Sequence, residues 1–180
     1  MTGSRVTRRY AKALFEAGQE SNQIELIEKD LSSVKEVIEK SKDFSILLLS
    51  PVIGSAEKRK IFRQMFEKNL QPLSLDFLNL LLDKGREKIL LDIIIHFFRL
   101  IDESRSILRG QLLSSHPFSA AQLQSLKKNL DRITGKNVQL DQQVDSSLIG
   151  GFVVRMDDTV IDTSIKSQLV KMKAYMISNE

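Results

Sequence analysis

The spacing of apolar residues changes near Gly110, and this change restricts the folds open to the chain. Before Gly110, apolar residues recur every three or four positions, which places them along one side of an α-helix. After it, Phe152, Val154 and Met156 alternate with Val153, Arg155 and Asp157, which is the period of a β-strand. We therefore expect an α+β fold that is mainly helical, with a helical bundle in residues 1–108 and a small α/β domain in residues 109–180.

The first domain is predicted to be a six-helix bundle, each helix carrying an apolar stripe. Gly85 favours a left-handed end for the fifth helix, and Pro51 stops the third because proline disfavours helical backbone at the residue before it. The expected helices are Val6–Glu20, a second that follows Asn22 as its N-cap, Asp43–Leu49, two that are capped by Ser55 and Ser74, and Glu87–Ser106.

The second domain is predicted to combine short strands with two helices. The expected strands are Leu112–Leu113, Val138–Leu140, Phe152–Met156 and Val160–Ile161. One helix runs from its cap Ser119 to Gly135, and a final helix, capped by Thr163 or Ser164, carries Ile165, Leu169, Met172 and Met176 on one stripe. A stripe that contains methionine belongs either to a domain core or to an interface.

The segment Val144–Ile165 combines turn, strand and helix-start signals without a catalytic motif. Asp157-Asp158, placed between two strands, predicts a hairpin turn. The glycine pair Gly150-Gly151 indicates positive φ angles or close backbone contact, and Asp162 is an acidic residue at the start of the final helix. We interpret Gly150, Gly151 and Asp162 as residues that form the fold.

Charged residues of both signs are mixed along the chain. The sequence has 27 lysines and arginines against 23 acidic residues, a net charge of +4, with no basic stretch that would follow a phosphate backbone. Two tyrosines and no tryptophan leave few aromatic side chains for stacking on bases. A basic nucleic-acid-binding module, or a generic protein-interaction module, is therefore kept only as the alternative function.

No residue set typical of an enzyme can be assembled from this sequence. It has no cysteine, and its two histidines, His96 and His116, lack the spacing of metal ligands. The acidic residues near the hairpin lack the alternating spacing and distal glutamate of a calcium loop, and no glycine-rich phosphate loop occurs. We expect no catalytic residue, no cofactor and no metal.

No apolar stretch of the sequence is long enough to cross a membrane. The longest, Ile89–Ile101, is interrupted by Asp92, His96 and Arg99, whereas a span needs about 20 apolar residues. The first residues include arginines but no apolar signal core, so no secretory signal is expected.

The fifth predicted helix has a wider apolar surface than a helix covered on one side needs. Asp76, Asn79 and Asp83 form one narrow polar line, and leucines together with Phe77 fill the remaining arc. The first helix shares this feature, because alanine and glycine extend its stripe. Each helix is either central to the core or packed on the core with one side and on a partner helix with the other.

The chain resembles the delta subunit of F-type ATP synthases, called the oligomycin-sensitivity-conferring protein in mitochondria. Four segments carry the resemblance, in the order and at the spacing of that family. They are RRYAKALFE (Arg8–Glu16), SPVIGSAEKRKIF (Ser50–Phe62), FLNLLLDKGREKILLDIIIHF (Phe77–Phe97) and VDSSLIGGFVVRMDDTVIDTSI (Val144–Ile165).

This resemblance implies a non-catalytic subunit of the peripheral stalk, the stator of a rotary machine. In the family, the helical domain binds N-terminal helices of the alpha subunits, and the C-terminal domain binds the b subunits. The subunit would hold the catalytic head still while the rotor turns, so that proton flow is coupled to ATP synthesis. We expect a peripheral protein at the cytoplasmic face of a bacterial plasma membrane, or at an organellar inner or thylakoid membrane if the chain is a processed eukaryotic form.

The resemblance also implies a binding site on the two helices with wide apolar surfaces. In the family, the alpha-subunit helix lies in a groove between the first and fifth helices. The matching positions of this sequence are Tyr10, Ala13, Leu14, Ala17, Phe77, Leu78 and Leu81.

Overall fold

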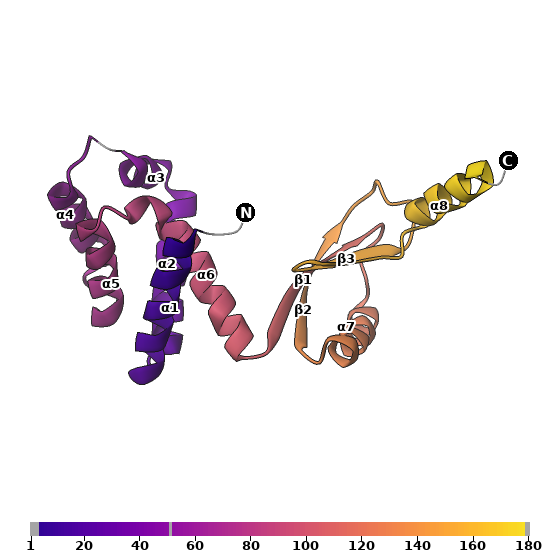
Figure 1. Ribbon diagram of the computed structural model, residues 1–180, viewed down its shortest axis with the longest axis horizontal. Coiled ribbons are helices and arrows are strands. Elements are labelled where there is room, and N and C mark those ends of the chain that lie inside the picture. Colours follow the sequence, from indigo (N-terminus) through magenta and orange to yellow (C-terminus); the bar gives the residue numbers. More distant parts are fainter. Residues whose placement is uncertain (1–3, 51, 179–180) are drawn as a thin grey trace. The chain divides into compact units, whose positions relative to one another are not determined.

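Two units make up the chain, which the computed structural model describes over residues 4–50 and 52–178 (Figure 1). The first unit ends at Ile101 and the second begins at Asp102. The fold is α+β and mainly helical, with a small four-stranded sheet, as predicted. The predicted domain boundary between residues 108 and 109 falls inside a strand, because β structure already begins at Ile107.

The helices of the first unit lie close to the predicted ranges. The expected sixth helix differs at its start, since its first turn is the short 3-10 helix η1 (Glu87–Ile89). Pro51, the predicted stop of the third helix, lies outside the described residues. The α-helices are α1 (Arg5–Glu20), α2 (Ile24–Lys40), α3 (Lys42–Leu49), α4 (Ser55–Phe66), α5 (Pro72–Asp83) and α6 (Leu90–Ser104).

The predicted N-caps of α2 and α4 are wrong by one residue. Asn22 has a positive φ of 54° in the turn before α2, so Gln23 occupies the cap position. Asparagine tolerates this left-handed conformation as well as the N-cap position. The sequence pattern does not show which of the two it adopts. Gly54 precedes α4, so Ser55 is already its first helical residue.

The predicted N-cap of α5 is wrong because the helix begins earlier than Ser74. Pro72 occupies the start of the helix, where its missing N–H costs nothing. The N–H of Gln71 donates to the Asp30 carboxylate on α2 at 2.8 Å, so a side chain from another helix satisfies the backbone at this end. Ser74 consequently lies buried within the first turn.

The end of α5 follows the prediction. Gly85 has a φ of 60°, and its N–H donates to the carbonyl of Leu82 at 3.2 Å. The N–H of Arg86 donates to the carbonyl of Leu81 at 2.8 Å. These two bonds form a Schellman motif, which satisfies carbonyls that the helix leaves open.

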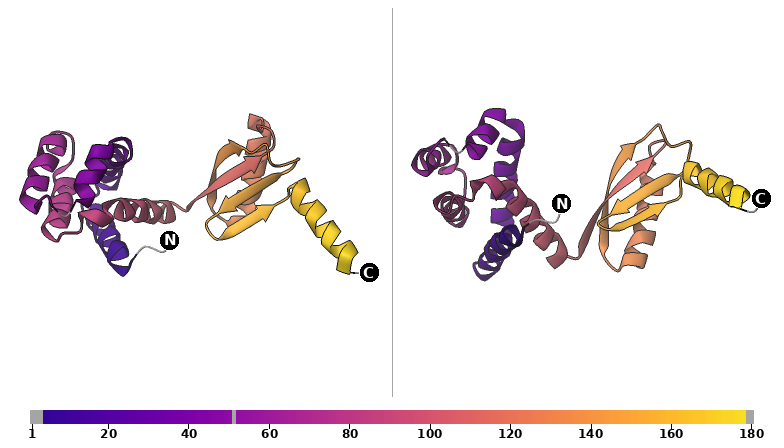
Figure 2. Two further views of the ribbon diagram at one scale, coloured as in Figure 1. Left: turned by 90° about the horizontal axis from the view of Figure 1, so that it is seen from above. Right: turned by 45° about the horizontal axis from the view of Figure 1, so that its top comes forward.

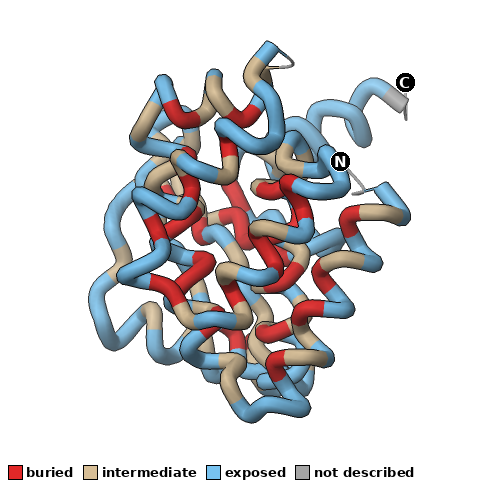
Figure 3. Tube along the Cα trace, turned by 90° about the vertical axis from the view of Figure 1, so that its left-hand side faces the viewer, coloured by how far each residue is buried: buried red, intermediate tan, exposed pale blue. Residues whose placement is uncertain are grey.

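The core of the first unit draws apolar side chains from every α-helix in it. Buried positions recur along the inward side of each helix in Figure 3. Phe44 of α3 packs against Phe62 and Phe66 of α4, with ring centroids 5.2 and 5.9 Å apart. Such aromatic contacts add to the area that they bury, so they join the short helix α3 to the bundle.

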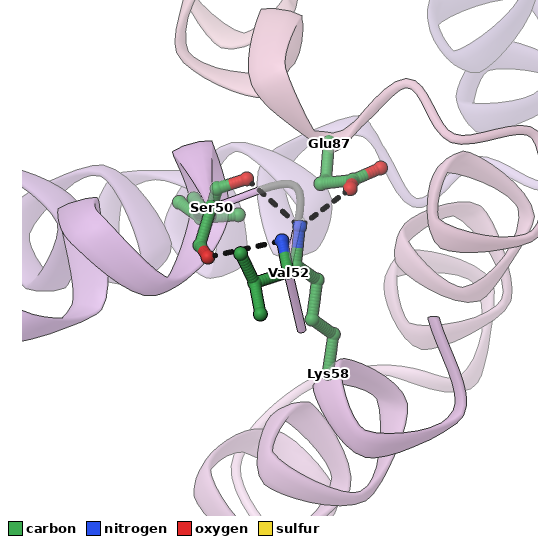
Figure 4. Close-up of polar contacts among 5 residues, drawn as sticks. Ser50, Val52, Lys58 and Glu87 are labelled. Atoms are coloured by element: carbon green, nitrogen blue, oxygen red, sulfur yellow. Dashed lines mark hydrogen bonds and ion pairs between the residues drawn. The ribbon is translucent and has the colours of Figure 1, made fainter. Parts of the chain in front are cut away.

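A buried lysine holds the end of α3 against α4 and η1. The side chain of Lys58 is only 2% exposed, and its Nζ donates to the carbonyl of Leu48 at 3.1 Å and to Glu87 at 2.7 Å (Figure 4). The second oxygen of Glu87 is buried without a hydrogen-bond partner. Burial by itself would raise the pKa of Glu87, but the hydrogen bond from Lys58, its own backbone and the charges of Lys58 and Lys88 together lower that pKa.

The second unit is built on a mixed sheet of order β2-β1-β3-β4. β1 pairs in parallel with β2, whereas the β1–β3 and β3–β4 pairs are antiparallel. Two strands are longer than predicted, because polar residues interrupt their apolar pattern. The strands are β1 (Ile107–Ser114), β2 (Asn137–Val144), β3 (Phe152–Met156) and β4 (Thr159–Asp162).

Helix α7 (Ala120–Thr134) packs along one face of this sheet (Figure 2). Its N-cap Ser119 forms a capping box with Gln122, and Gly135 ends it with a φ of 67°, as predicted. Gly110 lies within β1, where a Cβ would come 2.6 Å from the side chain of Met156. The glycine that marks the change in sequence pattern therefore makes room for a core side chain of β3.

The predicted hairpin at Asp157-Asp158 is confirmed. Met156 pairs with Thr159, so these two residues form the whole connection between β3 and β4. Asp157 has the positive φ, 43°, that a two-residue hairpin needs.

Gly150, Gly151, Asp162 and Ser164 form what we call the α8 socket, because they hold the start of α8 (Ile165–Ser178). The Asp162 carboxylate accepts the N–H of Ser164 at 2.9 Å and the hydroxyl of Ser167 at 2.6 Å, and these bonds lower the pKa of Asp162 to about 2. Ser164 Oγ in turn accepts the N–H of Ser167 at 3.3 Å, so Ser164 is the N-cap.

The two glycines of the α8 socket leave space for the chain that enters α8. The N–H of Ile165 donates to the carbonyl of Gly150 at 3.0 Å, and a Cβ on Gly150 would lie 2.7 Å from the Ile165 side chain. Gly151 has a φ of 77°, and a Cβ there would lie 2.5 Å from the carbonyl oxygen of Thr163. The sequence predicted positive φ or close backbone contact for this pair, and Gly151 has both.

Beyond its socket, α8 is exposed along its described length. Leu169, Met172 and Met176 are 52%, 62% and 70% exposed. The core interpretation of this stripe is therefore wrong for the isolated chain. Within residues 4–50 and 52–178, no helix combines the length and the apolar content that crossing a membrane requires.

Lys58→Met should lower the free energy of unfolding by about 3–5 kcal/mol, because it leaves Glu87 buried without its charge partner. Urea denaturation measures this loss. Lys58→Met/Glu87→Leu should lose less than the single variant, since both charges are then removed. Equal losses in the two variants would contradict the role given to the ion pair.

The same ion pair should make stability depend on pH. The folded-state pKa of Glu87 lies below its ordinary value of 4.5, so its contribution is fully present above that value and is lost as pH falls through the lowered pKa. Urea denaturation at a series of pH values should show this loss in the natural protein. Glu87→Gln should show a flatter acid limb, and identical limbs would contradict the assignment.

Gly151→Ala should loosen the start of α8, because it forces both an unfavourable φ and a clash with the Thr163 carbonyl. Gly135→Ala is the matched control, with a φ of 67° but no atom near the added Cβ. Hydrogen exchange of the Ile165 amide should accelerate at least about tenfold in Gly151→Ala. Gly135→Ala should leave that amide unchanged, and equal acceleration in both would contradict the socket.

Candidate helix-binding groove

A groove with a volume of about 510 Å³ lies between α1 and α5 in the first unit. Most of its lining is apolar, with one charged residue from each helix. The lining residues are Arg9, Tyr10, Ala13, Leu14, Ala17, Leu73, Asp76, Phe77 and Leu80.

Small side chains on α1 keep the groove open. Tyr10, Ala13, Leu14 and Ala17 recur at helical spacing along one side of that helix. Ala13 is exposed and Ala17 is half-buried, so neither fills the space above it. Leu14 is buried and belongs to the floor. A second helix can therefore approach the α1 backbone closely at the two alanines.

An aromatic contact joins the two helices beneath the groove. The rings of Tyr10 on α1 and Phe77 on α5 meet edge-on, with centroids 6.5 Å apart. Tyr10 is half-buried and Phe77 is buried, so the contact belongs partly to the core and partly to the groove. This geometry is the favourable arrangement for two aromatic rings, and it keeps α1 and α5 at a set separation.

The α5 side of the groove is formed by Leu73, Asp76, Phe77 and Leu80. Leu80 is 43% exposed, although leucine is a residue that folding normally buries. Arg9 and Asp76 are both exposed and add one charge of each sign. The arrangement suits an amphipathic helix, whose apolar residues would cover Leu80 while polar groups meet the two charges.

Five of the seven residues predicted for this groove line it, but Leu78 and Leu81 do not. They are 2% and 1% exposed and belong to the core of the first unit. At about 100° per residue, these two leucines lie on the core side of α5, well away from the side that carries Leu73 and Leu80. The prediction of Leu78 and Leu81 as groove lining is corrected for this reason.

The residues that the prediction missed are Arg9, Leu73, Asp76 and Leu80. The α5 residues that line the groove recur at helical spacing, at Leu73, at Asp76 or Phe77, and at Leu80. The signal that they share one side of α5 is therefore present in the sequence. The apolar arc of α5 is continuous, however, and nothing in its pattern separates the leucines that face the core from those that face the groove.

The residues that line the groove offer a surface for binding but no arrangement of reactive groups. Among the described residues, no group of three or more His, Cys, Asp or Glu side chains could hold a metal ion. Gly150, Gly151 and Asp162 belong to the α8 socket of the second unit, where they shape the backbone.

Comparison with known proteins gives the family of this chain. Residues 6–176 match the family model described as ATP synthase delta (OSCP) subunit. The chain is 38% identical to an ATP synthase subunit delta of Desulforudis audaxviator over 93% of its own length and 92% of the relative's. It is 35% identical to that of Solidesulfovibrio magneticus over the full length of both chains.

A solved structure has the same fold. A chain of the Toxoplasma gondii mitochondrial ATP synthase hexamer superposes with a TM-score of 0.73 at 22% sequence identity, over 97% of this chain and 98% of the other. The sequence and structural matches both extend over nearly the whole length. The chain therefore belongs to the ATP synthase delta (OSCP) subunit family, and is a structural, non-catalytic subunit of the peripheral stalk.

Proposed function

We propose that the groove between α1 and α5 receives the N-terminal helix of an ATP synthase alpha subunit. The first unit, as a six-helix bundle, would then sit on the catalytic head, and the second unit would bind the b subunits. Held at both ends, the subunit would keep the head from turning with the rotor at the cytoplasmic face of the membrane. Family membership and the apolar groove support this proposal.

The observation that carries the proposal is the exposed apolar lining of the groove. Leu80 stands 43% exposed beside Ala13 and Ala17, where an incoming side chain has space and apolar contacts. Burial of one such leucine-sized side chain contributes roughly 1.5–3 kcal/mol. A few of these contacts suffice for a stable complex once the cost of ordering the partner is met.

The length of the groove fits a helix better than a small ligand. Its α1 lining extends from Arg9 to Ala17, and a rise of about 1.5 Å per residue gives this stretch a length of roughly 12 Å. Two turns of a partner helix would match that length.

The alternative of nucleic-acid binding has little support from the second unit. A sheet that reads single-stranded bases presents aromatic side chains on an open face. Here Phe152 of β3 packs edge-on against Phe118, with centroids 5.6 Å apart, on the face covered by α7. These rings are used in the core.

Ala13→Glu and Leu80→Glu should each weaken binding of a peptide from the alpha-subunit N-terminus by at least about tenfold, because each places a charge in the apolar lining. Isothermal titration calorimetry on the full chain measures the affinity. Both positions are exposed or half-exposed, so the variants should fold normally.

The matched control is Leu49→Glu on α3, a leucine that is 58% exposed and lies outside the groove. It should bind the peptide as the natural protein does. Undiminished binding by folded Ala13→Glu and Leu80→Glu would reject the groove as the alpha-subunit site. Leu78→Glu is unsuitable as a probe, since it would place a charge in the core.

A further inference from the structure

The side of α1 that borders the groove changes the sign of its charge along the helix. At about 100° per residue, Arg5, Arg9, Glu16 and Glu20 fall within an arc of about 60°, beside the groove alanines and away from the core. The two arginines lie in the N-terminal half of α1 and the two glutamates in its C-terminal half. We call this row of four residues the α1 charge gradient.

The charges at the two ends of the α1 charge gradient are not neutralised. Near its middle, Lys12 Nζ lies 3.5 Å from Glu16 Oε1, which forms an ion pair within the helix. Arg5, Arg9 and Glu20 are exposed, and none of them forms an ion pair in the part of the chain that the structure describes. Positive charge is therefore available for a partner at one end, and negative charge at the other.

The order of these charges is unfavourable for α1 itself. A helix is stabilised by acidic residues near its N-terminus and by basic residues near its C-terminus, because of the partial charges at its two ends. α1 has no acidic residue in its first turn and no basic residue in its last turn. Arg5 and Arg9, four residues apart, also repel each other. Folding does not explain this order of charges, so we look for its role in binding.

The opposite wall of the groove has the opposite sign. Asp76 of α5 is exposed and lines the groove, as does Arg9 of α1. Asp83, farther along the same side of α5, already pairs with Arg59 of α4. A helix in the groove would therefore meet positive charge on the α1 wall and negative charge on the α5 wall, which also restricts its rotation about its own axis.

We propose that the α1 charge gradient selects the charge order of the helix that the groove accepts. The occupant is an amphipathic helix whose acidic end lies beside Arg5 and Arg9 and whose basic end lies beside Glu20. Arginine suits this role, because its guanidinium group donates two parallel hydrogen bonds to one carboxylate. The proposal rests on the function proposed for the groove, and it adds the charge pattern of the occupant and the end of the groove at which each charge lies.

Anionic partners that are not helices fit the observations less well. A lipid surface attracts clusters of about four to eight basic residues, and a nucleic acid attracts basic side chains along its phosphates. In the α1 charge gradient, Glu16 and Glu20 share one side of the helix with only two arginines. The glutamates would repel either of these surfaces, whereas a helix with both signs can pair with both ends.

The test uses the full chain and two synthetic amphipathic peptides as long as α1, with the same composition and the same leucine stripe. The graded peptide has glutamates in its first half and lysines in its second half, and the alternating peptide mixes them. Fluorescence anisotropy at low salt should show at least about fivefold tighter binding of the graded peptide. The ratio of the two affinities is then compared between protein variants, which cancels any difference in helicity between the peptides.

Charge reversal at the arginines should remove this preference. Arg5→Glu/Arg9→Glu should lower the affinity ratio at least about fivefold, whereas Lys60→Glu/Lys68→Glu should keep it. The control makes the same change in net charge at two exposed positions outside the groove. The melting temperature of Arg5→Glu/Arg9→Glu should rise, because an acidic residue then begins α1. Equal effects of the two double variants on the ratio, or a lower melting temperature, would overturn the proposal.

A nitroxide on the glutamate end of the graded peptide shows where that end binds. It should broaden the amide resonances of Arg5 and Arg9 more than that of Glu20, and the reverse pattern would contradict the proposed charge order. Phosphatidylglycerol vesicles and a single-stranded RNA are tested separately for binding to the natural protein. If either binds, and Arg5→Glu/Arg9→Glu abolishes that binding, the arginines serve that partner and the proposal is wrong.

Leu80→Glu separates this proposal from the function proposed for the groove. It should weaken binding of both peptides alike, because both use the apolar lining. If Leu80→Glu has this effect but the arginine reversal leaves the affinity ratio unchanged, the α1 charge gradient alone is rejected. If folded Leu80→Glu binds both peptides as the natural protein does, the groove is rejected, and the proposed charge selection with it.

Discussion

The binding role proposed for the first unit depends on how α5 divides one continuous apolar surface between two neighbours. Its inner side contributes Leu78 and Leu81 to the core, while Leu80 faces the groove. Phe77 belongs to both sides and meets Tyr10 across the gap to α1. A rotation of α5 by one residue, about 100°, would expose core leucines and close the groove, so tight packing of the inner side keeps the outer side available.

Long-range polar contacts set the positions of the helices that this packing requires. Asp30 of α2 accepts the N–H of Gln71 at the start of α5, and Lys58 of α4 binds both the end of α3 and Glu87. The bonds to the Gln71 N–H and to the Leu48 carbonyl each satisfy a backbone group at a helix terminus, whereas Lys58 and Glu87 form an ion pair between side chains. Because these polar contacts join residues far apart in sequence, they define how the helices pack against one another. Local capping signals do not contain this information.

In the second unit, local sequence signals were more informative. The positive φ at Gly151, the hairpin at Asp157 and the cap of α7 all depend on conformations that neighbouring residues specify, and each was predicted. The lengths of β1 and β2 were not, since polar residues interrupt their apolar pattern. The exposure of α8 was also left open, because an apolar stripe has the same spacing in a core and at an interface.

The sequence by itself determined the class of fold, the order of its elements, several turns and the family, since these follow from periodicity, from backbone preferences and from four segments in order. It also identified the two helices that form the groove. Only the tertiary structure decided which leucines of α5 line it, that Lys58 is buried, and that the stripe of α8 remains uncovered. These properties depend on which surfaces of the helices and strands pack against each other. Helical spacing shows which residues share one side of a helix, but not which element packs on that side.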